Sequence, residues 1–472
     1  MVHIIELNNL VIERSNLLQI TRLFSDQQGT CLLYSGKSQD ASFKSLLFLF
    51  PFEFVQIHQG KQQRYHHDKC KPVVSLSLEN PWDALKLLMP DLGKGNGCHP
   101  EWVGFFGYEM GAFSDVDKIT KHFLADTPEA YWQRCAVVLS VDHRTKQGTV
   151  YIADKSECCF EDERHHWMER LSSQDYWAEL IQAKIEDTGE EKNNATYQLA
   201  APIESIQSYV TKIDQIKESI RDGDVYQVNL SQQFTFCGKT KPYNLFHQLT
   251  QINPAPFSAF MHLNGYTIVS SSPERFLSKS GNKLETRPIK GTAPRGATRQ
   301  EDEKNYRALI ASEKERAELL MITDLMRNDL GRISAKGSVQ VPLVWGCEAY
   351  TNVYHLYSIV QSQMRNGLHP LDAIRACFPG GSITGCPKLN AMQTIAELEK
   401  RPRGIYTGSI GYFTGDGDFD LNIAIRTFVM TAEKISVQLG GGIVIDSDPI
   451  KEYQETLYKG QSIFKALGMH MN

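Results

Sequence analysis

Short apolar runs separated by glycine-containing turns fill the first 154 residues, and they limit the possible fold more than any other feature of the chain. The runs are GTCLLYSG (29–36), PVVSLSL (72–78), VGFFGYEMGAF (103–113), CAVVLSVD (135–142) and GTVYIAD (148–154). Runs of this length between turn signals are typical of antiparallel strands. We also interpret SLLFLFPFEF (45–54) as a buried strand with a bend at Pro51, because it is far too short to span a bilayer.

Beyond these runs, helical and strand-like segments mix to the C-terminus. Residues 160–186 are charged and helical, whereas 189–202 have no apolar period and are expected to form a linker or an exposed crossing. We therefore predict an α+β fold of large antiparallel sheets with helices on the outside. We divide the chain into an N-terminal region with its linker, 1–200, and a second region, 201–472, which holds more of the unusual residues.

The bulk composition excludes some classes of function. The 472 residues carry a net charge of −5 and include 22% charged residues, without the basic stripe that nucleic-acid binding requires. The ten cysteines include no Cys-x-x-Cys pair and no zinc-like spacing, so free thiols in a reducing cytosol are the simplest interpretation. The N-terminus does not resemble a signal peptide, and we expect a soluble, cytoplasmic protein.

The segment ETRPIKGTAPRG (285–296) raises a question about one lysine. Leu284, Thr286, Pro288 and Lys290 alternate as they would on one face of a strand. Lysine is strongly hydrated and rarely buried. Lys290 is therefore either a solvated edge residue or a desolvated amine that can react, and the alternation alone leaves both interpretations open.

Two expected helices each carry a Glu-x-x-Glu pair. The helix at 313–333 places Glu315 and Glu318 on one face, and the helix at 446–467 places Glu452, Glu455 and Lys459 on one face. A single pair of this kind is usually a solvated charged face. Two pairs that meet could instead hold Mg²⁺, which prefers one or two carboxylates, several waters and an anionic substrate.

Four further features could bind an anion or assist catalysis. FPGGSITGCPK (378–388) lacks the Lys-Ser/Thr of a phosphate loop, so we interpret it as a glycine turn before a helix. QLGGGIVIDS (438–447) is either a tight turn after a strand or a row of bare N–H groups for a carboxylate. Arg426, expected in an apolar strand, is either paired or a carboxylate clamp. Glu274, after a proline in SSSPERFL, predicts nothing by itself.

Taken together, these motifs resemble one family, the chorismate-utilising enzymes. SSSPERFL, ETRPIKGTAPRG, RAELLMITDLMRNDLGRI, FPGGSITGCPK, GSIGYF and the GGGIV…YQET tail follow the family's order from about 203 to 465. The N-terminal part resembles the same proteins more loosely. The resemblance implies the family's fold, in which large antiparallel sheets pack face to face with helices outside. It also implies chorismate as the substrate and Mg²⁺ as the cofactor.

The same resemblance implies roles for individual residues. Glu318 and Glu455 resemble direct Mg²⁺ ligands, Glu315 and Glu452 resemble outer carboxylates that act through water, and Glu274 resembles the general acid/base. The implied clamp on the two substrate carboxylates consists of Arg426, Lys459 and the backbone of Gly440, Gly441 and Gly442, and His355 and Thr292 resemble further active-site residues.

Two positions distinguish the branches of this family. The anthranilate-forming branch carries Ala at the place of Lys290, whereas the branch that forms 4-amino-4-deoxychorismate, toward p-aminobenzoate and folate, carries Lys. The isochorismate and salicylate enzymes use an upstream lysine where this chain has Gln227. The resemblance therefore implies a transferase that aminates chorismate at C4 with Lys290 as the covalent nucleophile. The alternatives are anthranilate formation and a non-catalytic subunit of an amidotransferase complex.

The resemblance also implies partners. No cysteine lies in the Gly-x-Cys-x-Gly setting of a glutaminase, so ammonia is expected from a separate glutamine amidotransferase subunit in a heterodimer. The anthranilate enzymes sense tryptophan with a Leu-Leu-Glu-Ser element, which corresponds to LLYS (32–35) here. Tryptophan is therefore a candidate ligand of the N-terminal region, although Tyr34 in place of Glu weakens the case for feedback inhibition.

Overall fold

A computed structural model of the chain describes residues 2–36, 42–66, 71–95, 97–115, 123–154, 158, 163–183, 197–200, 203–238, 240–350 and 353–469. Helices and strands mix along these ranges, as predicted for an α+β fold. No helix in the described ranges is long and apolar enough to cross a membrane. Cysteines such as Cys31 and Cys135 are free thiols, in agreement with the prediction from their spacing.

Two antiparallel sheets extend from one long ribbon, in which β3 (Lys44–His58) pairs with β7 (Ala130–Asp142). The first sheet continues from β3 through β2 (Cys31–Tyr34), β11 (Phe257–Leu263), β12 (Tyr266–Ser272), β21 (Thr427–Met430), β22 (Ile435–Ile443) and β10 (Gln227–Cys237). The second sheet continues from β7 through β6 (Pro100–Phe106), β19 (Ser409–Thr414), β20 (Phe419–Asn422), β13 (Arg275–Ser280), β14 (Lys283–Arg287) and β17 (Val353–Gln363), which also pairs with β15 (Ile289–Pro294) and β16 (Gln340–Ala349).

Shorter strands extend the edges of these sheets. They are β1 (His3–Glu6) on β8 (Gln147–Ile152), β4 (Lys61–His66) with β5 (Val74–Leu76), and β9 (Gln198–Leu199) and β18 (Gly385–Cys386) on β10. The run at 45–54 is a strand whose register shifts between Pro51 and Glu53, which confirms the predicted strand and bend. Only the first part of 103–113 is a strand, because η1 (Tyr108–Phe113) is a 3₁₀ helix.

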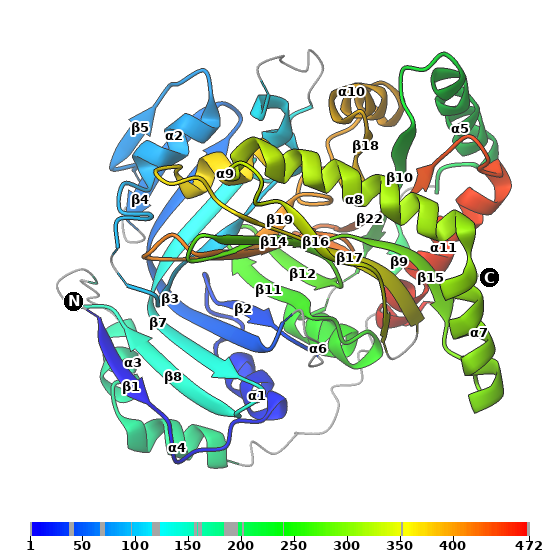
Figure 1. Cartoon of the computed structure of the whole chain (residues 1–472). Coiled ribbons are helices and arrows are strands. Elements are labelled where there is room, and N and C mark those ends of the chain that lie inside the picture. The colour runs from blue at the N-terminus through cyan, green and yellow to red at the C-terminus, as the bar shows by residue number, and fades with distance from the viewer. Residues whose placement is uncertain are drawn as a thin grey trace.

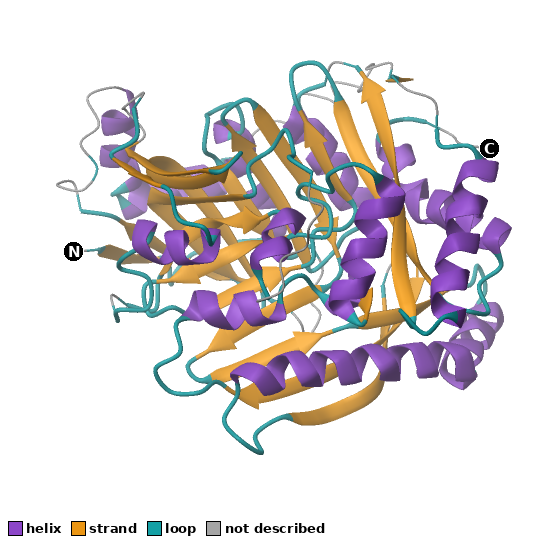
Figure 2. Cartoon of the chain, turned by 90° about the horizontal axis from the view of Figure 1, so that it is seen from above, coloured by secondary structure: helices purple, strands orange, loops and turns teal. Residues whose placement is uncertain are grey.

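Three apolar layers hold the sheets and helices together. Buried residues between the sheets include Phe48, Val103, Met261 and Ile410. Two larger apolar clusters lie on the outer faces, one between the first sheet and its helices and the other between the second sheet and its helices. The sheets therefore pack face to face with helices outside, as predicted (Figures 1 and 2). The helices are α1 (Arg14–Phe24), α2 (Pro81–Leu88), α3 (Glu163–Leu171), α4 (Gln174–Gln182), α5 (Ile206–Arg221), α6 (Pro242–Ile252), α7 (Arg299–Ala311), α8 (Glu313–Ile333), α9 (Pro370–Cys377), α10 (Lys388–Glu399) and α11 (Pro449–Ala466).

Strands from the predicted N-terminal region pair directly with strands from the second region. Leu33 of β2 pairs with Ala259 of β11, and Gly104 of β6 pairs with Gly411 of β19. Both sheets are therefore continuous across the predicted division of the chain. The boundary near residue 200 stays a prediction, and the linker call at 189–202 falls mostly outside the described residues.

Local signals set the ends of the two helices that carry the Glu-x-x-Glu pairs. Ser312 caps α8 by accepting a hydrogen bond from the backbone N–H of Glu315. Asp448 caps α11 by accepting from the backbone of Ile450 and Lys451, with Pro449 as the first helical residue. Both helices therefore form where the sequence predicts them.

Candidate active site

The candidate site forms where the chain crosses between the two sheets. Glu274 lies between β12 of the first sheet and β13 of the second, and Arg426 lies on the return from β20 to β21. The crossings are joined because the Ile423 N–H donates to the Glu274 carbonyl at 3.0 Å and the Ser271 N–H donates to the Arg426 carbonyl at 3.1 Å. The prediction that Arg426 lies in a strand is wrong, because its φ of 52° turns the chain as it changes sheets.

Glu274 is a buried carboxyl group. The residue is 4% exposed, and its Oε1 accepts a hydrogen bond from Ser382 Oγ at 2.6 Å. Burial raises the pKa of Glu274 to about 7, although Ser382, Lys290 and the backbone N–H of Ile289 act in the opposite direction. A carboxyl group that titrates near neutral pH can both give and take a proton, as a general acid/base must.

Lys290 lies directly before a β-bulge in β15. The register between β15 and β17 shifts between Lys290 and Thr292, and Gly291 between them has a φ of 77°. A Cβ atom at Gly291 would lie 2.9 Å from Glu315 Oε2. The glycine therefore supplies the backbone conformation of the bulge and lets α8 approach the strand closely.

The Lys290 amine points towards β22 and has no ion-pair partner among the described residues. A Cβ atom added to Gly442 would lie 3.0 Å from Lys290 Nζ and 2.7 Å from Gln227 Nε2. Burial lowers the pKa of Lys290, whereas the nearby Glu318 carboxylate acts to raise it. A partly desolvated amine of this kind is neutral more often than a surface lysine, which favours the reactive interpretation.

The three consecutive glycines lie within β22 and do not form a turn, so the tight-turn alternative is wrong. Gly440, Gly441 and Gly442 pair with Ser231, Leu230 and Asn229 of β10. On the other side, β21 pairs with β22 only as far as Val437. The glycine segment therefore has one strand edge without a partner strand in the described chain, where backbone N–H groups can bind an anion.

The glutamates of α8 and α11 face a common space. The pKa of Glu315 is raised by burial and then by Glu318 of the same helix and Glu455 of α11. The pKa of Glu452 is raised by burial and by Glu455, although Ser447 opposes the shift. The effect of Glu455 on Glu315 indicates that carboxylates of the two helices lie within electrostatic range of each other.

Lys459 lies beside the same carboxylates and the glycine strand. Its Nζ is 2.6 Å from Glu455 Oε1 and donates to the Gly440 carbonyl at 3.2 Å. A Cβ atom at Gly441 would lie 3.4 Å from Glu452 Oε2 and 3.7 Å from Lys459 Nζ. The predicted metal and clamp residues of α11 therefore lie against β22.

The donor atoms suit Mg²⁺, although the side chains are not drawn together around one point. Within the described ranges, no three His, Cys, Asp or Glu side chains are grouped closely enough to hold a metal ion. Hard carboxylate oxygens from two helices, some with pKa values raised by burial and then by neighbouring carboxylates, are nevertheless the chemistry that this cation prefers. The assignment of Glu318 and Glu455 as direct ligands stays a prediction.

Arg426 is a partly buried cation without a carboxylate partner in the described part of the chain. Its Nη1 donates to Asn253 Oδ1 at a long 3.4 Å. Burial lowers the pKa of Arg426, and Tyr350 acts to raise it. A desolvated guanidinium without a counter-ion is unfavourable, and a bound carboxylate would relieve that cost.

His355 and Thr292 lie opposite each other on β17 and β15. Thr292 Oγ1 is 2.9 Å from His355 Nδ1, and the His355 ring packs edge-on against Tyr350 at a centroid distance of 5.1 Å. Burial lowers the pKa of His355 to about 3, and Arg426 adds to the effect. The imidazole is therefore neutral at physiological pH, and its buried Nε2 has no hydrogen-bond partner among the described residues.

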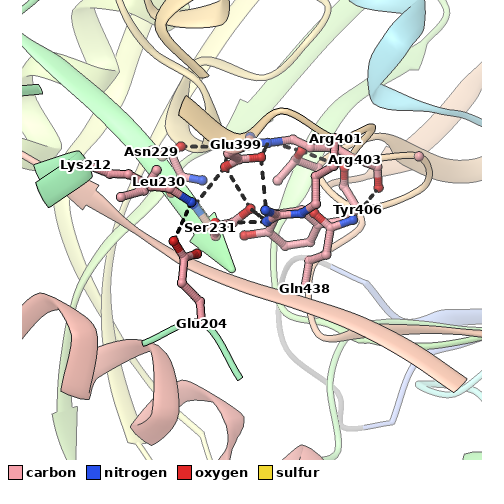
Figure 3. A network of polar contacts seen from close by, with 12 residues as sticks. Glu204, Lys212, Asn229, Leu230, Ser231, Glu399, Arg401, Arg403, Tyr406 and Gln438 are labelled. Carbon is pink, nitrogen blue, oxygen red and sulfur yellow. Dashed lines mark hydrogen bonds and ion pairs between the residues drawn. The ribbon is translucent and has the colours of Figure 1, made fainter. Parts of the chain in front are cut away.

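A buried ion pair anchors the backbone behind the site (Figure 3). The side chains of Arg403 and Glu399 are 1% and 0% exposed and approach to 2.8 Å. Glu399 also accepts hydrogen bonds from the backbone N–H and the hydroxyl of Ser231, both at 2.8 Å. Arg403 donates to the carbonyls of Asn229 at 2.6 Å and Ile383 at 3.1 Å. It thus joins β10 to the 3₁₀ turn η2 (Gly381–Ile383).

Three further polar residues lie at the site, although the sequence motifs did not place them there. Both amide atoms of Gln227 are buried, and neither has a hydrogen-bond partner within the described part of the chain. Ser382 contacts Glu274, and a Cβ at Gly440 would lie 2.9 Å from the Tyr406 hydroxyl. Gln227 carries a sequence signal, an amide among apolar strand residues, whereas the roles of Ser382 and Tyr406 depend on contacts between distant segments.

The LLYS segment is part of the core of the first sheet. Tyr34 is 5% exposed, and its ring meets Phe246 of α6 edge-on at 6.2 Å between centroids. Ser35 contributes its backbone N–H to Ser45 Oγ at 2.9 Å. Tryptophan binding near Leu32–Ser35 stays a prediction.

This arrangement of sheets and helices is the fold of the chorismate-utilising enzymes. The crystal structure of anthranilate synthase component I from Streptococcus pneumoniae TIGR4 matches it with a TM-score of 0.75 and 29% sequence identity, over 90% of this chain and 93% of that chain. The sequence also matches the family described as chorismate binding enzyme over residues 29–465. The chain belongs to this chorismate binding enzyme family.

Curated relatives carry the names of two branches. Aminodeoxychorismate synthase component 1 of Escherichia coli (strain K12) is 40% identical over 366 residues, which cover 77% of this chain and 76% of that protein. Anthranilate synthase component 1 1 of Haloarcula marismortui is 44% identical over 283 residues, which cover 60% of this chain and 57% of that protein. The match thus spans little more than half the length of the H. marismortui relative, and similarity alone does not separate the two branches.

Proposed function

We propose that this chain is a Mg²⁺-dependent transferase that aminates chorismate at C4 and releases 4-amino-4-deoxychorismate and water. The observation that carries the proposal is the Lys290 amine, which is partly desolvated, close to Gly442 and Gln227, and within electrostatic range of Glu274. Lysine at this position is the feature that the family resemblance associates with this reaction. Relatives named aminodeoxychorismate synthase component 1 support it.

Substrate binding in this proposal relies on cationic side chains and on the open strand edge of β22. Chorismate carries two carboxylates, which Arg426, Lys459 and the open edge of β22 can bind. Glu318 and Glu455 would hold Mg²⁺, which would bind a substrate carboxylate and offset its charge. The neutral His355 ring and Thr292 contribute uncharged hydrogen-bonding groups.

The proposed reaction has two displacement steps. The neutral Lys290 amine bonds to C2, both ring double bonds shift by one position, and the C4–O bond breaks while Glu274 gives its proton to the departing hydroxyl, which leaves as water. Ammonia then bonds to C4, both double bonds shift back, and the C2–N bond breaks to release Lys290 as a neutral amine. The new C4 ammonium passes one proton to Glu274, which restores its acid form.

The nitrogen source in this proposal is a separate protein. The E. coli relative is named component 1, which supports the existence of a second component. We propose a glutamine amidotransferase in this role, because the chain carries no glutaminase nucleophile in its expected Gly-x-Cys-x-Gly setting. Ammonium salts should replace that partner in the purified chain.

Trapping of the covalent intermediate tests the proposal directly. Chorismate added with Mg²⁺ but without ammonia should form an adduct that peptide mapping places within ETRPIKGTAPRG. Lys290→Ala should remove the adduct and greatly slow amination, and Lys290→Arg should not restore it because a guanidinium stays protonated. Lys283→Ala, on the exposed part of β14, is the matched control and should keep both the adduct and the wild-type rate of amination. An adduct on another residue, or a wild-type rate in Lys290→Ala, would contradict the proposal.

Anthranilate formation is the second candidate, because the H. marismortui and S. pneumoniae relatives carry that name. Product analysis separates the candidates, since anthranilate is aromatic whereas 4-amino-4-deoxychorismate is not. A non-catalytic subunit would show no turnover of chorismate with Mg²⁺ and ammonium at all.

A further inference from the structure

Ser382 is the only described side chain that donates a hydrogen bond to the Glu274 carboxyl group. The hydroxyl is 2.6 Å from Glu274 Oε1, and Ser382 itself is 5% exposed. The backbone N–H of Ile289 also acts to lower the pKa of the same carboxyl group. The contact is therefore a buried one in which water does not compete.

The turn that carries Ser382 is fixed on three sides. A Cβ atom on Gly381 would overlap Leu325 of α8, so the turn is packed tightly against that helix. Thr384 Oγ1 donates to the Gly380 carbonyl at 2.7 Å, and Arg403 donates to the Ile383 carbonyl at 3.1 Å. FPGGSITG thus forms a rigid support that aims one hydroxyl at one carboxyl oxygen.

We propose that Ser382 is a positioning residue whose hydroxyl occupies Oε1 of Glu274 and leaves Oε2 to carry the proton that is transferred. A carboxylic acid accepts hydrogen bonds best at its carbonyl oxygen and carries its proton on the other oxygen. A donor fixed at Oε1 therefore selects Oε2 for the acid proton. This inference rests on the proposed function, in which Glu274 gives a proton to the leaving hydroxyl and takes one back from the new ammonium.

The same hydrogen bond affects both proton transfers of Glu274, the one to the leaving hydroxyl and the one from the new ammonium. The described charged or titratable groups that act on Glu274 are Lys290 of β15 and Tyr350 after β16. Because Ser382 also stabilises the carboxylate, its removal should raise the pKa of Glu274 further, by about one to two pH units for a hydrogen bond to a charged group. A more basic Glu274 keeps its proton more strongly, so transfer to the leaving hydroxyl should slow.

Titration of Glu274 tests the inference without the need for turnover. The infrared band of the protonated carboxyl group, assigned by its loss in Glu274→Gln, is followed against pH in the wild type and in Ser382→Ala. We expect the midpoint to rise by about one to two pH units in Ser382→Ala and by less in Ser382→Cys, whose thiol is a weaker donor. Ser409→Ala is the control, because Ser409 is also buried and donates to the Asn422 carbonyl at 2.6 Å.

Kinetics with ammonium supply the second measurement. At a constant concentration of free ammonia, Ser382→Ala should lower kcat about ten-fold, leave KM for chorismate unchanged and shift the basic limb of the pH profile upward. An unchanged titration midpoint, or unchanged kcat, in a folded Ser382 variant would overturn the inference. If Ser382→Ala does not fold, the titration midpoint and kcat of Ser382→Cys test the inference instead. If the wild type does not turn over chorismate, the proposed function fails, and the infrared titration still reports on the link between Ser382 and Glu274.

Discussion

Replacement of Arg403 with Met should strongly destabilise the fold. The guanidinium donates to both carboxylate oxygens of Glu399, at 2.8 and 3.1 Å, and to the Asn229 carbonyl at 2.6 Å. Methionine fills much of the apolar volume of the stem but removes these hydrogen bonds and the charge. Glu399, whose side chain is 0% exposed, would then keep Ser231 as its main partner. Breaking a buried pair in this way costs about 3–5 kcal/mol of unfolding free energy.

The loss should depend on pH in a defined direction. Burial acts to raise the pKa of Glu399, but Arg403 and Arg401 hold it below its usual value in the wild type. Such a group contributes stability above its unfolded pKa, and this contribution is lost as the pH falls through the folded pKa. Without Arg403, burial should raise the folded pKa above the unfolded value, so the variant gains stability as the pH falls. The difference between the two proteins should therefore shrink from pH 7 towards about pH 5.

Urea unfolding, followed by tryptophan fluorescence at both pH values, measures this difference. Arg327→Met is the matched control, because Arg327 pairs with Asp324 at 2.6 Å but the two side chains are 53% and 63% exposed. Exposed pairs contribute about 0–1 kcal/mol, so the control should change little. A loss below about 1 kcal/mol for Arg403→Met at neutral pH, or a loss that grows as the pH falls, would refute the reasoning.

Three further predictions concern the candidate site. Glu318→Gln and Glu455→Gln should each abolish magnesium-dependent turnover without loss of the folded circular dichroism spectrum, and normal turnover at ordinary Mg²⁺ would contradict the metal assignment. The purified chain should use ammonium but not glutamine until a glutaminase subunit is added, so efficient use of glutamine by the chain alone would contradict the partner proposal. Gly291→Ala should lower the stability of the fold by more than Gly265→Ala, for which roughly 1 kcal/mol is expected. Both glycines have positive φ, but only Gly291 lies against Glu315. Equal melting temperatures of the two variants would argue against the close approach of α8 to the strand.

The helices of the site could be predicted because their signals are local. Ser312 and Asp448 cap α8 and α11, and the apolar period of each helix begins just after its cap. The spacing of the glutamates then follows from helical geometry alone. The sequence could not show how the two helices lie relative to each other, because this depends on how the sheets beneath them are connected.

The strand predictions failed where pairing partners decide the outcome. Gly440 and its neighbours were as compatible with a turn as with a strand, and only their pairing with β10, about two hundred residues earlier in the chain, makes them a strand. Arg426 stands in a run of apolar residues that suggests a strand, but the chain leaves β20 there to reach the other sheet. Both errors come from long-range topology, which local periodicity does not report.

The sharing of both sheets by early and late segments has a consequence for synthesis of the protein. During translation, β2 and β6 leave the ribosome long before β11 and β19, their partners, have been made. Until then these strands present unpaired backbone edges, together with apolar residues such as Leu33 and Phe105, to other chains. Closure of such distant pairings is also slow. The nascent chain should therefore need protection by chaperones until β19 emerges, and chains truncated before that point should aggregate instead of folding as an N-terminal unit.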